Sequence, residues 1–160
     1  MFGQLSHELE VNVPASEAWE LYSMLRLAKL VEEEPASGIE KVDVIEGDGG
    51  AGTILKLTFA GPPLFTVYKE KFTKLDNEKR LKETKVIEGG YLELGFTLYL
   101  IRFKVIEKDN DSCIIESTIE YDVKEEAVAN ASYVTIDALA NIAELSKNYL
   151  TKNKAAKDEH

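Results

Sequence analysis

The chain has 160 residues, 44% of them hydrophobic, which suffices for one domain whose core needs neither disulfide nor metal. Nineteen Lys and Arg against 29 Asp and Glu give a net charge of −10, which argues against nucleic acid and anionic membranes as partners. The single cysteine excludes an intramolecular disulfide, and two histidines argue against a histidine metal site or a His-based triad.

The first part of the chain predicts a strand, two short helices and two further strands. Residues 5–13 alternate apolar and polar side chains, as a half-buried strand does, and a proline ends the pattern. A short helix follows with Ser16 as its expected N-cap, and a second covers about 26–34. Strands are expected over about 39–46 and 53–60.

Four glycines separate those two strands, at positions 47, 49, 50 and 52. A phosphate-binding loop would need amide groups aimed at the anion and usually a helix behind them. Glu46 and Asp48 would instead repel an anion, and a strand-like segment follows. We therefore expect the glycines to turn a hairpin with positive φ angles.

The rest of the chain predicts hairpin-connected strands and one long helix. The expected order is a Gly-Pro-Pro turn at 61–63, strand 65–75, an Asp-Asn turn at 76–77, strand 79–88, a Gly-Gly turn at 89–90, strand 91–107, a turn at 108–111 and strand 113–123. Apolar residues at helical spacing, Leu139 among them, predict a helix over 125–154. A charged, frayed tail is expected over about 153–160.

This order of elements predicts a single α+β domain over residues 1–160. The apolar face of a continuous antiparallel sheet needs a cover, which the long helix supplies, and a curved sheet under one helix tends to enclose a pocket. Cys113 is expected to be a buried, unreactive thiol. The start of the chain has no apolar signal core and nothing approaches a membrane span, so a cytoplasmic protein is expected.

One predicted strand bears on assembly. Opposite Tyr91 and Tyr99, its other face is expected to carry an apolar stripe made of Leu92, Leu94, Phe96, Leu98 and Leu100. If that face points outward, the stripe favours a homodimer. If the strand is covered on both sides, the stripe says nothing about assembly.

Tyr68, Glu70 and Phe72 alternate along one strand, so their side chains share one face. From the residues alone, a solvent-exposed face with an incidental aromatic side chain is the more common arrangement, because exposed glutamates are frequent. The residues by themselves therefore leave the function of this face open.

Several longer segments carry a family resemblance. They are HELEV (7–11), GDGGAGTIL (47–55), YKEKF (68–72), DNEKRLK (76–82), IEGGYLELG (87–95), DSCII (111–115) and EYDVK (120–124). With the order of elements, they resemble the pathogenesis-related class 10, or birch-pollen-allergen (Bet v 1), family, and within it the norcoclaurine synthase group of plant alkaloid enzymes. The resemblance implies a helix-grip fold: a seven-stranded curved antiparallel sheet around a long C-terminal helix, two short helices, and a hollow hydrophobic cavity that needs no metal or cofactor.

The same resemblance implies a site. Residues matching Tyr68, Glu70 and Lys82 face the cavity in the synthases and do acid–base work. Phe72, Tyr99, Ile101 and Leu139 are expected to contact the substrate, a small hydrophobic alkaloid. One position departs from the pattern, since Ile101 stands where the synthases carry an aspartate.

Three functions are compatible with this site. The first is isomerisation of a β,γ-unsaturated alkaloid ketone, of the neopinone-to-codeinone type, in which Glu70 moves the proton and Lys82 and Tyr68 stabilise the dienolate. The alternative is norcoclaurine synthesis, the Pictet–Spengler condensation of dopamine with 4-hydroxyphenylacetaldehyde. The third is a non-catalytic alkaloid carrier. Replacement of the aspartate by Ile101 makes the first our leading expectation, because it makes the cavity more apolar.

Overall fold

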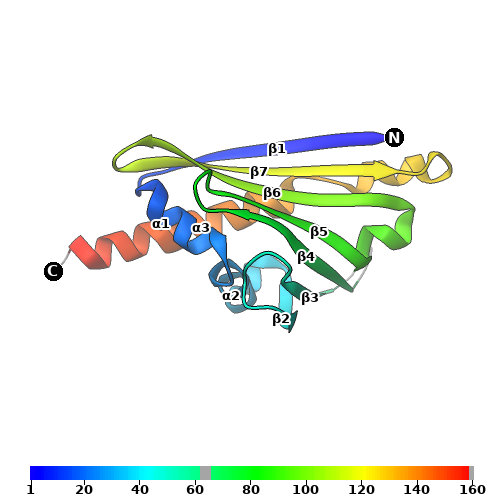
Figure 1. Cartoon of the computed structure of the whole chain (residues 1–160), viewed down its shortest axis with the longest axis horizontal. Coiled ribbons are helices and arrows are strands. Elements are labelled where there is room, and N and C mark those ends of the chain that lie inside the picture. The colour runs from blue at the N-terminus through cyan, green and yellow to red at the C-terminus, as the bar shows by residue number, and fades with distance from the viewer. Residues whose placement is uncertain (62–65, 159–160) are drawn as a thin grey trace.

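The computed structural model describes residues 1–61 and 66–158, and within them seven strands form one antiparallel sheet (Figure 1). The strand order across the sheet is β1-β7-β6-β5-β4-β3-β2. The strands are β1 (Phe2–Val11), β2 (Ile39–Glu46), β3 (Ile54–Phe59), β4 (Val67–Asp76), β5 (Leu81–Gly89), β6 (Phe96–Asp109) and β7 (Ser112–Val123). Each neighbouring pair is antiparallel.

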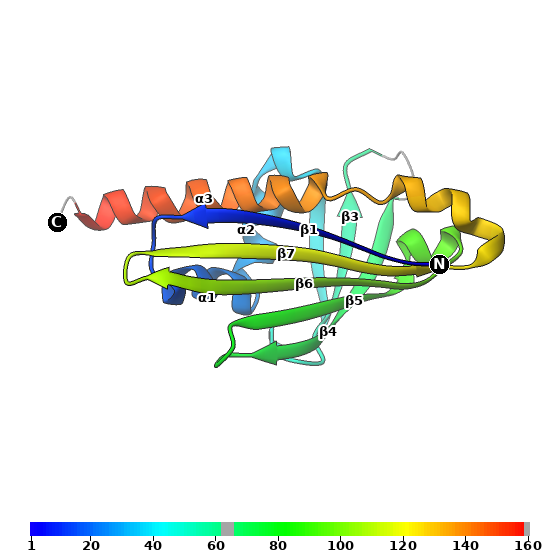
Figure 2. The ribbon, with the colours of Figure 1, turned by 90° about the horizontal axis from the view of Figure 1, so that it is seen from above.

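In the described part of the chain, the three α-helices lie on one side of this sheet, and three 3-10 helices connect elements of the fold (Figure 1). They are α1 (Ala15–Ser23), α2 (Arg26–Glu33) and α3 (Asp137–Asp158), with 3-10 helices η1 (Pro35–Ser37), η2 (Gly90–Leu94) and η3 (Glu125–Tyr133). Figure 2 shows α3 running alongside β1, and Figure 1 shows α1 and α2 on the same side of the sheet as α3. The predicted curved sheet around a C-terminal helix with two short helices is therefore confirmed.

The period of two along the central strands decides which side chains enter the interior. On β4 the buried residues are Tyr68, Glu70 and Phe72, and on β5 they include Lys82 and Thr84. Intervening positions on these strands are more exposed. Because alternate side chains of a strand point to opposite faces, both strands send polar groups into the covered side of the sheet.

The glycine-rich segment is a hairpin loop between β2 and β3, as predicted. Gly47, Gly49 and Gly52 have φ angles of 92°, 109° and 93°. The loop is held by Thr53, whose Oγ1 accepts a hydrogen bond of 2.8 Å from the amide of Gly49. At Gly47 a Cβ would lie 2.7 Å from the Cα of Thr53, so this position has no room for a side chain.

The strand predicted over 91–107 is wrong at its start. Residues 90–94 form η2, and β6 begins at Phe96. The reason is the backbone of three glycines: Gly89, Gly90 and Gly95 have positive φ angles, and the amide of Gly95 donates to the carbonyl of Tyr91 to close the turn.

The apolar stripe predicted on this segment is also wrong. The register moves from Phe96 opposite Val123 to Leu98 opposite Asp122, so β6 carries a bulge between them. As a result Phe96 is buried on the same side as Tyr99. The other members, Leu92, Leu94, Leu98 and Leu100, are half-buried, and the first two pack on the core. These residues therefore do not form the single outward stripe that would have favoured a homodimer.

The C-terminal helix begins later than predicted. Residues 125–133 form η3, and α3 starts only at Asp137. Between them lie three consecutive β-branched residues, Val134 to Ile136, which favour extended backbone. At the other end α3 continues to Asp158, through most of the segment expected to be a frayed tail.

Smaller differences concern a cap and a turn. Ser16 is not the N-cap of α1, since the helix begins at Ala15 and the carbonyl of Pro14 accepts the amides of Glu17 and Ala18. The helix predicted over 26–34 and the Asp76 turn are present, and the Asp76 side chain accepts the amide of Lys79. Two of the three residues of the predicted Gly-Pro-Pro turn, 62 and 63, and the predicted strand start at 65 lie outside the described residues.

Three findings bear on the exclusions made from composition. Cys113 is buried, and burial raises the pKa of its thiol to about 11. No helix among the described residues is long and apolar enough to cross a membrane. In the same part of the chain, His, Cys, Asp and Glu side chains nowhere gather in threes with the placement that a metal ion needs.

Candidate active site

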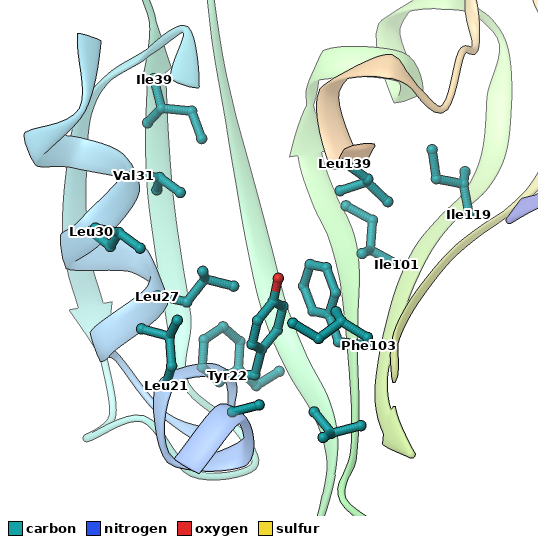
Figure 3. Close-up of a cluster of buried hydrophobic side chains, with 14 of the residues drawn as sticks. Leu21, Tyr22, Leu27, Leu30, Val31, Ile39, Ile101, Phe103, Ile119 and Leu139 are labelled. Atoms are coloured by element: carbon teal, nitrogen blue, oxygen red, sulfur yellow. The ribbon is translucent and has the colours of Figure 1, made fainter. Parts of the chain in front are cut away.

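A cavity of about 220 Å³ lies between the inner face of the sheet, α2 and the first turns of α3. In Figure 3, Leu27, Val31 and Ile39 face Ile101, Phe103 and Leu139 from the other side. The lining is mostly apolar and is completed by Ala28, Ser37, Gly38, Val42, Leu55, Leu57, Phe59, Tyr68, Glu70, Phe72, Lys82, Thr84, Tyr91, Tyr99, Ile119, Ala138 and Ile142. Its volume is below the roughly 300 to 1,000 Å³ typical of small-molecule pockets.

All seven side chains predicted for the site line this one cavity. Tyr68, Glu70 and Phe72 come from β4, Lys82 from β5, Tyr99 and Ile101 from β6, and Leu139 from α3. The sheet register brings them together: Phe72 is opposite Thr84 on β5, and Thr84 is opposite Ile101 on β6. Their positions are thus established, whereas their roles in a reaction stay predictions.

Glu70 is a buried carboxyl group, 9% exposed, with a hydroxyl beside it. The Oγ1 of Thr84 donates to Oε2 of Glu70 over 3.3 Å. Burial raises the pKa of Glu70 because it disfavours the charged form, and Lys82 and the Thr84 hydrogen bond partly oppose this effect. A raised pKa makes a carboxylate a stronger base, which suits it to accept a proton and later return it.

Lys82 is 4% exposed, and its ammonium is held at the end of α1. Its Nζ donates to the backbone carbonyls of Tyr22 and Met24, each over 3.1 Å, and lies 4.0 Å from the centre of the Phe72 ring. Carbonyls at a helix C-terminus and an aromatic face both stabilise a cation. Burial nevertheless lowers the pKa of Lys82 to about 8, with the charge of Glu70 opposing that shift.

Three tyrosines line the cavity as well. Tyr91 and Tyr99 are stacked, with ring centres 4.3 Å apart, and Tyr68 packs edge-on against Phe59 at 5.0 Å. Burial raises the pKa values of Tyr68 and Tyr99 well above the usual range of a phenol. These hydroxyl groups stay protonated near neutral pH and remain able to donate hydrogen bonds.

Part of the lining was not predicted from the sequence. Thr84 was not singled out, although it lies two residues after Lys82 on a strand and must therefore share its face. Leu27 and Val31 on α2 were missed as well, because helical spacing alone does not tell whether an apolar face packs on a core or borders a cavity.

The arrangement supports acid–base chemistry on a bound organic molecule. A carboxylate placed to accept a proton faces the same apolar space as an ammonium and phenols placed to donate hydrogen bonds. Such donors stabilise negative charge that develops on an oxygen, most strongly where water is excluded. The set fits proton transfer next to a carbonyl group, in either an isomerisation or a condensation.

Comparisons with known proteins place the chain in a family and identify similar enzymes. The model of the Pathogenesis-related protein Bet v 1 family matches residues 2–153. The chain is 50% identical over 156 residues to norbelladine synthase of Narcissus pseudonarcissus, which covers 97% of the chain and 96% of that protein. It is 44% identical over 158 residues to S-norcoclaurine synthase of Thalictrum flavum subsp. glaucum, over 97% of the chain and 75% of that protein.

A solved structure has the same fold. The norcoclaurine synthase of Thalictrum flavum in complex with dopamine and hydroxybenzaldehyde superimposes with a TM-score of 0.86 at 40% identity, over 95% of the chain and 88% of that structure. That relative thus binds an aromatic amine and an aromatic aldehyde together.

Proposed function

Since the chain belongs to the pathogenesis-related protein Bet v 1 family, whose norbelladine and norcoclaurine synthases it resembles over most of its length, we propose that it condenses an aromatic amine with an aromatic aldehyde. The observation that carries the proposal is a mostly apolar cavity into which the buried carboxyl group of Glu70 and the buried amine of Lys82 both point, with the pKa of the first raised and that of the second lowered by burial. The amine–aldehyde pair bound in the norcoclaurine synthase structure supports the substrate class.

The reaction uses the lining groups as follows. The free amine attacks the aldehyde carbon, a C–N bond forms, and the carbonyl electron pair moves to oxygen, where Lys82 and Tyr68 donate hydrogen bonds. Glu70 takes the proton that the nitrogen loses. Lys82 gives a proton to that oxygen, which completes the carbinolamine. Glu70 then returns its proton to the hydroxyl group, which leaves as water while the nitrogen lone pair forms the C=N bond of an iminium, and Glu70 is again a carboxylate. If a ring carbon attacks that iminium, Glu70 accepts the ring proton and aromaticity returns.

The isomerisation expected first from the sequence has less support. The two relatives described above are named as synthases. The carboxyl group, ammonium and phenol would serve a dienolate equally well, so the geometry does not separate the two reactions. The relatives favour the condensation, which was the alternative in the sequence analysis.

The test is condensation by purified protein. Dopamine and tyramine are each mixed with 4-hydroxyphenylacetaldehyde or a hydroxybenzaldehyde, with and without cyanoborohydride to trap the imine, and products are followed by chiral chromatography and mass spectrometry. Glu70→Gln is expected to lower kcat by about 100-fold or more. Glu88→Gln, which changes a largely exposed glutamate on β5, serves as the matched control and is expected to be active.

Each other outcome points elsewhere. Rates and product ratios equal to those of heat-denatured protein would reject the condensation. Growth of conjugated-enone absorbance from a β,γ-unsaturated morphinan ketone would identify the isomerase instead. Tight alkaloid binding without any product, unaffected by Glu70→Gln, would identify a carrier.

A further inference from the structure

Thr84 occupies a central place in the cavity wall. It lies on β5 between Phe72 on β4 and Ile101 on β6, each of which is its directly opposite partner in the sheet. The residue is 3% exposed and lines the cavity. Thr84 therefore lines the same cavity as Glu70.

The hydroxyl of Thr84 contacts one oxygen of Glu70. Its Oγ1 lies 3.3 Å from Oε2. An ionised carboxylate can only accept hydrogen bonds, so in that state the threonine must be the donor. Because Glu70 and Thr84 are 9% and 3% exposed, bulk water cannot easily take the place of the lost donor if Thr84 is removed.

Ile101, the residue opposite Thr84 on β6, has no polar group that could contact Glu70 in place of the threonine. The resemblance to the synthases implies an aspartate at position 101, directly across from Thr84, and this chain has an isoleucine there. Among the described residues that line the cavity, Glu70 is the one acidic side chain and Lys82 the one basic side chain. A pair of nearby carboxylates would share protons, whereas here a single carboxylate is left with a neutral hydroxyl beside it.

We infer that Thr84 is a positioning residue for Glu70: it holds Oε2 against β5 and leaves Oε1 for the substrate proton, so that one carboxylate and one hydroxyl serve where two carboxylates would otherwise stand. This inference rests on the proposed proton-accepting role of Glu70. The hydroxyl favours the ionised form of Glu70, which agrees with its lowering effect on the pKa of that group. Without it, Glu70 would hold its proton to higher pH.

The test compares Thr84→Val with Thr84→Ser. Valine keeps the shape and removes the donor, whereas serine keeps the donor. In Thr84→Val the acid limb of kcat/KM for the condensation is expected to move to higher pH, so that activity measured on that limb falls about three- to tenfold. Thr84→Ser should restore the wild-type limb. Thr73→Val, which changes an exposed threonine on β4, is the matched control and should leave the profile unchanged.

A second readout does not depend on turnover. The 13C signal of the Glu70 carboxyl group, assigned by its loss in Glu70→Gln, is titrated in the substrate-free protein. A midpoint higher in Thr84→Val than in wild type supports the inference even if no condensation is found, which separates it from the proposed function. Equal midpoints would overturn it. So would a further loss of activity when Thr84→Val is added to Glu70→Gln, since Thr84 would then act other than through Glu70.

Discussion

Glu70 and Lys82 are two buried ionisable groups, and burial disfavours the charged form of each. Both are less than 10% exposed, and burial raises the pKa of the carboxyl group and lowers that of the amine to about 8. The charge of Lys82 partly offsets the rise in the pKa of Glu70, and the charge of Glu70 partly offsets the fall in the pKa of Lys82. A site of this kind can transfer protons near neutral pH without a histidine, which in this chain is found only at positions 7 and 160.

The burial of Lys82 predicts a dependence of stability on pH. Its pKa is about 8 in the folded protein against 10.5 for a free lysine, so between these values the unfolded chain binds more protons than the folded one. The free energy of unfolding should therefore rise with pH through this window, relative to Lys82→Met, by on the order of 2 to 3 kcal/mol. Chemical denaturation of both proteins from pH 7 to 10.5 measures the difference.

The control for this experiment is Lys85→Met, which changes an exposed lysine on the same strand. Its difference from wild type should stay constant over the same pH range. A constant difference for Lys82→Met as well would mean that the amine is not displaced from its ordinary pKa.

Much of the residue-level site follows from two-residue spacing. Tyr68, Glu70 and Phe72 share a face in any strand, and the spacing from Lys82 to Thr84 repeats that pattern on β5. Spacing does not tell which side of the sheet is covered. The family resemblance implied the interior, and these side chains line the cavity there. The carbonyl groups that hold Lys82 come from residues about 60 positions earlier, and no local pattern reveals such a contact.

At the level of elements, the hairpin loop between β2 and β3 lends itself to a matched pair of substitutions. Gly47 and Gly52 have φ angles of 92° and 93°, so alanine is strained equally at both. Only at Gly47 does an added Cβ meet the backbone, 2.7 Å from the Cα of Thr53, whereas nothing lies within 4 Å at Gly52. Gly52→Ala should cost about 1 to 2 kcal/mol and Gly47→Ala clearly more.

Denaturant unfolding of the two variants and wild type provides the measurement. Equal losses in the free energy of unfolding would show that the loop relaxes away from Thr53, so that the close contact does not affect stability. Neither variant touches a charged group, so their difference reports only on packing and backbone strain.

The elements that were predicted wrongly from the sequence, η2 and η3, are stabilised by contacts between segments far apart in the chain. The 3-10 helices η2 and η3 pack on each other: Nδ2 of Asn130 donates to the carbonyl of Leu94 over 2.8 Å, and a Cβ on Gly95 would lie 2.4 Å from that of Ala127. Hydrophobic periodicity describes a segment by itself and is silent about such pairing. β2 and β7 were predicted within one residue of their ends, whereas β1, predicted over 5–13 from its alternation, begins three residues earlier and ends two residues earlier.

For the whole molecule, the loss of the predicted stripe changes the expectation for assembly. Phe96 is buried by the bulge in β6, and the leucines that remain are half-buried. We expect a monomer of 17.9 kDa at micromolar concentration, to be measured by size-exclusion chromatography with light scattering. A dimer that persists on dilution would show that another surface drives association.

The net charge of −10 predicts how the two proposed substrates respond to salt. An arylethylamine is a cation in solution at neutral pH and is attracted by the field of an acidic protein, whereas an aldehyde is neutral and is not. Salt shortens the range of that field, from a Debye length of about 30 Å at 0.01 M to about 8 Å at 0.15 M.

The KM for the amine should therefore rise, by about two- to threefold between 0.02 and 0.3 M NaCl, while the KM for the aldehyde stays constant. Steady-state kinetics with one substrate varied at a time gives both values from the same protein, so the aldehyde serves as the internal control. A parallel rise of both values would indicate a salt effect on the protein itself, and a constant KM for the amine would show that the surface charge has no part in its capture.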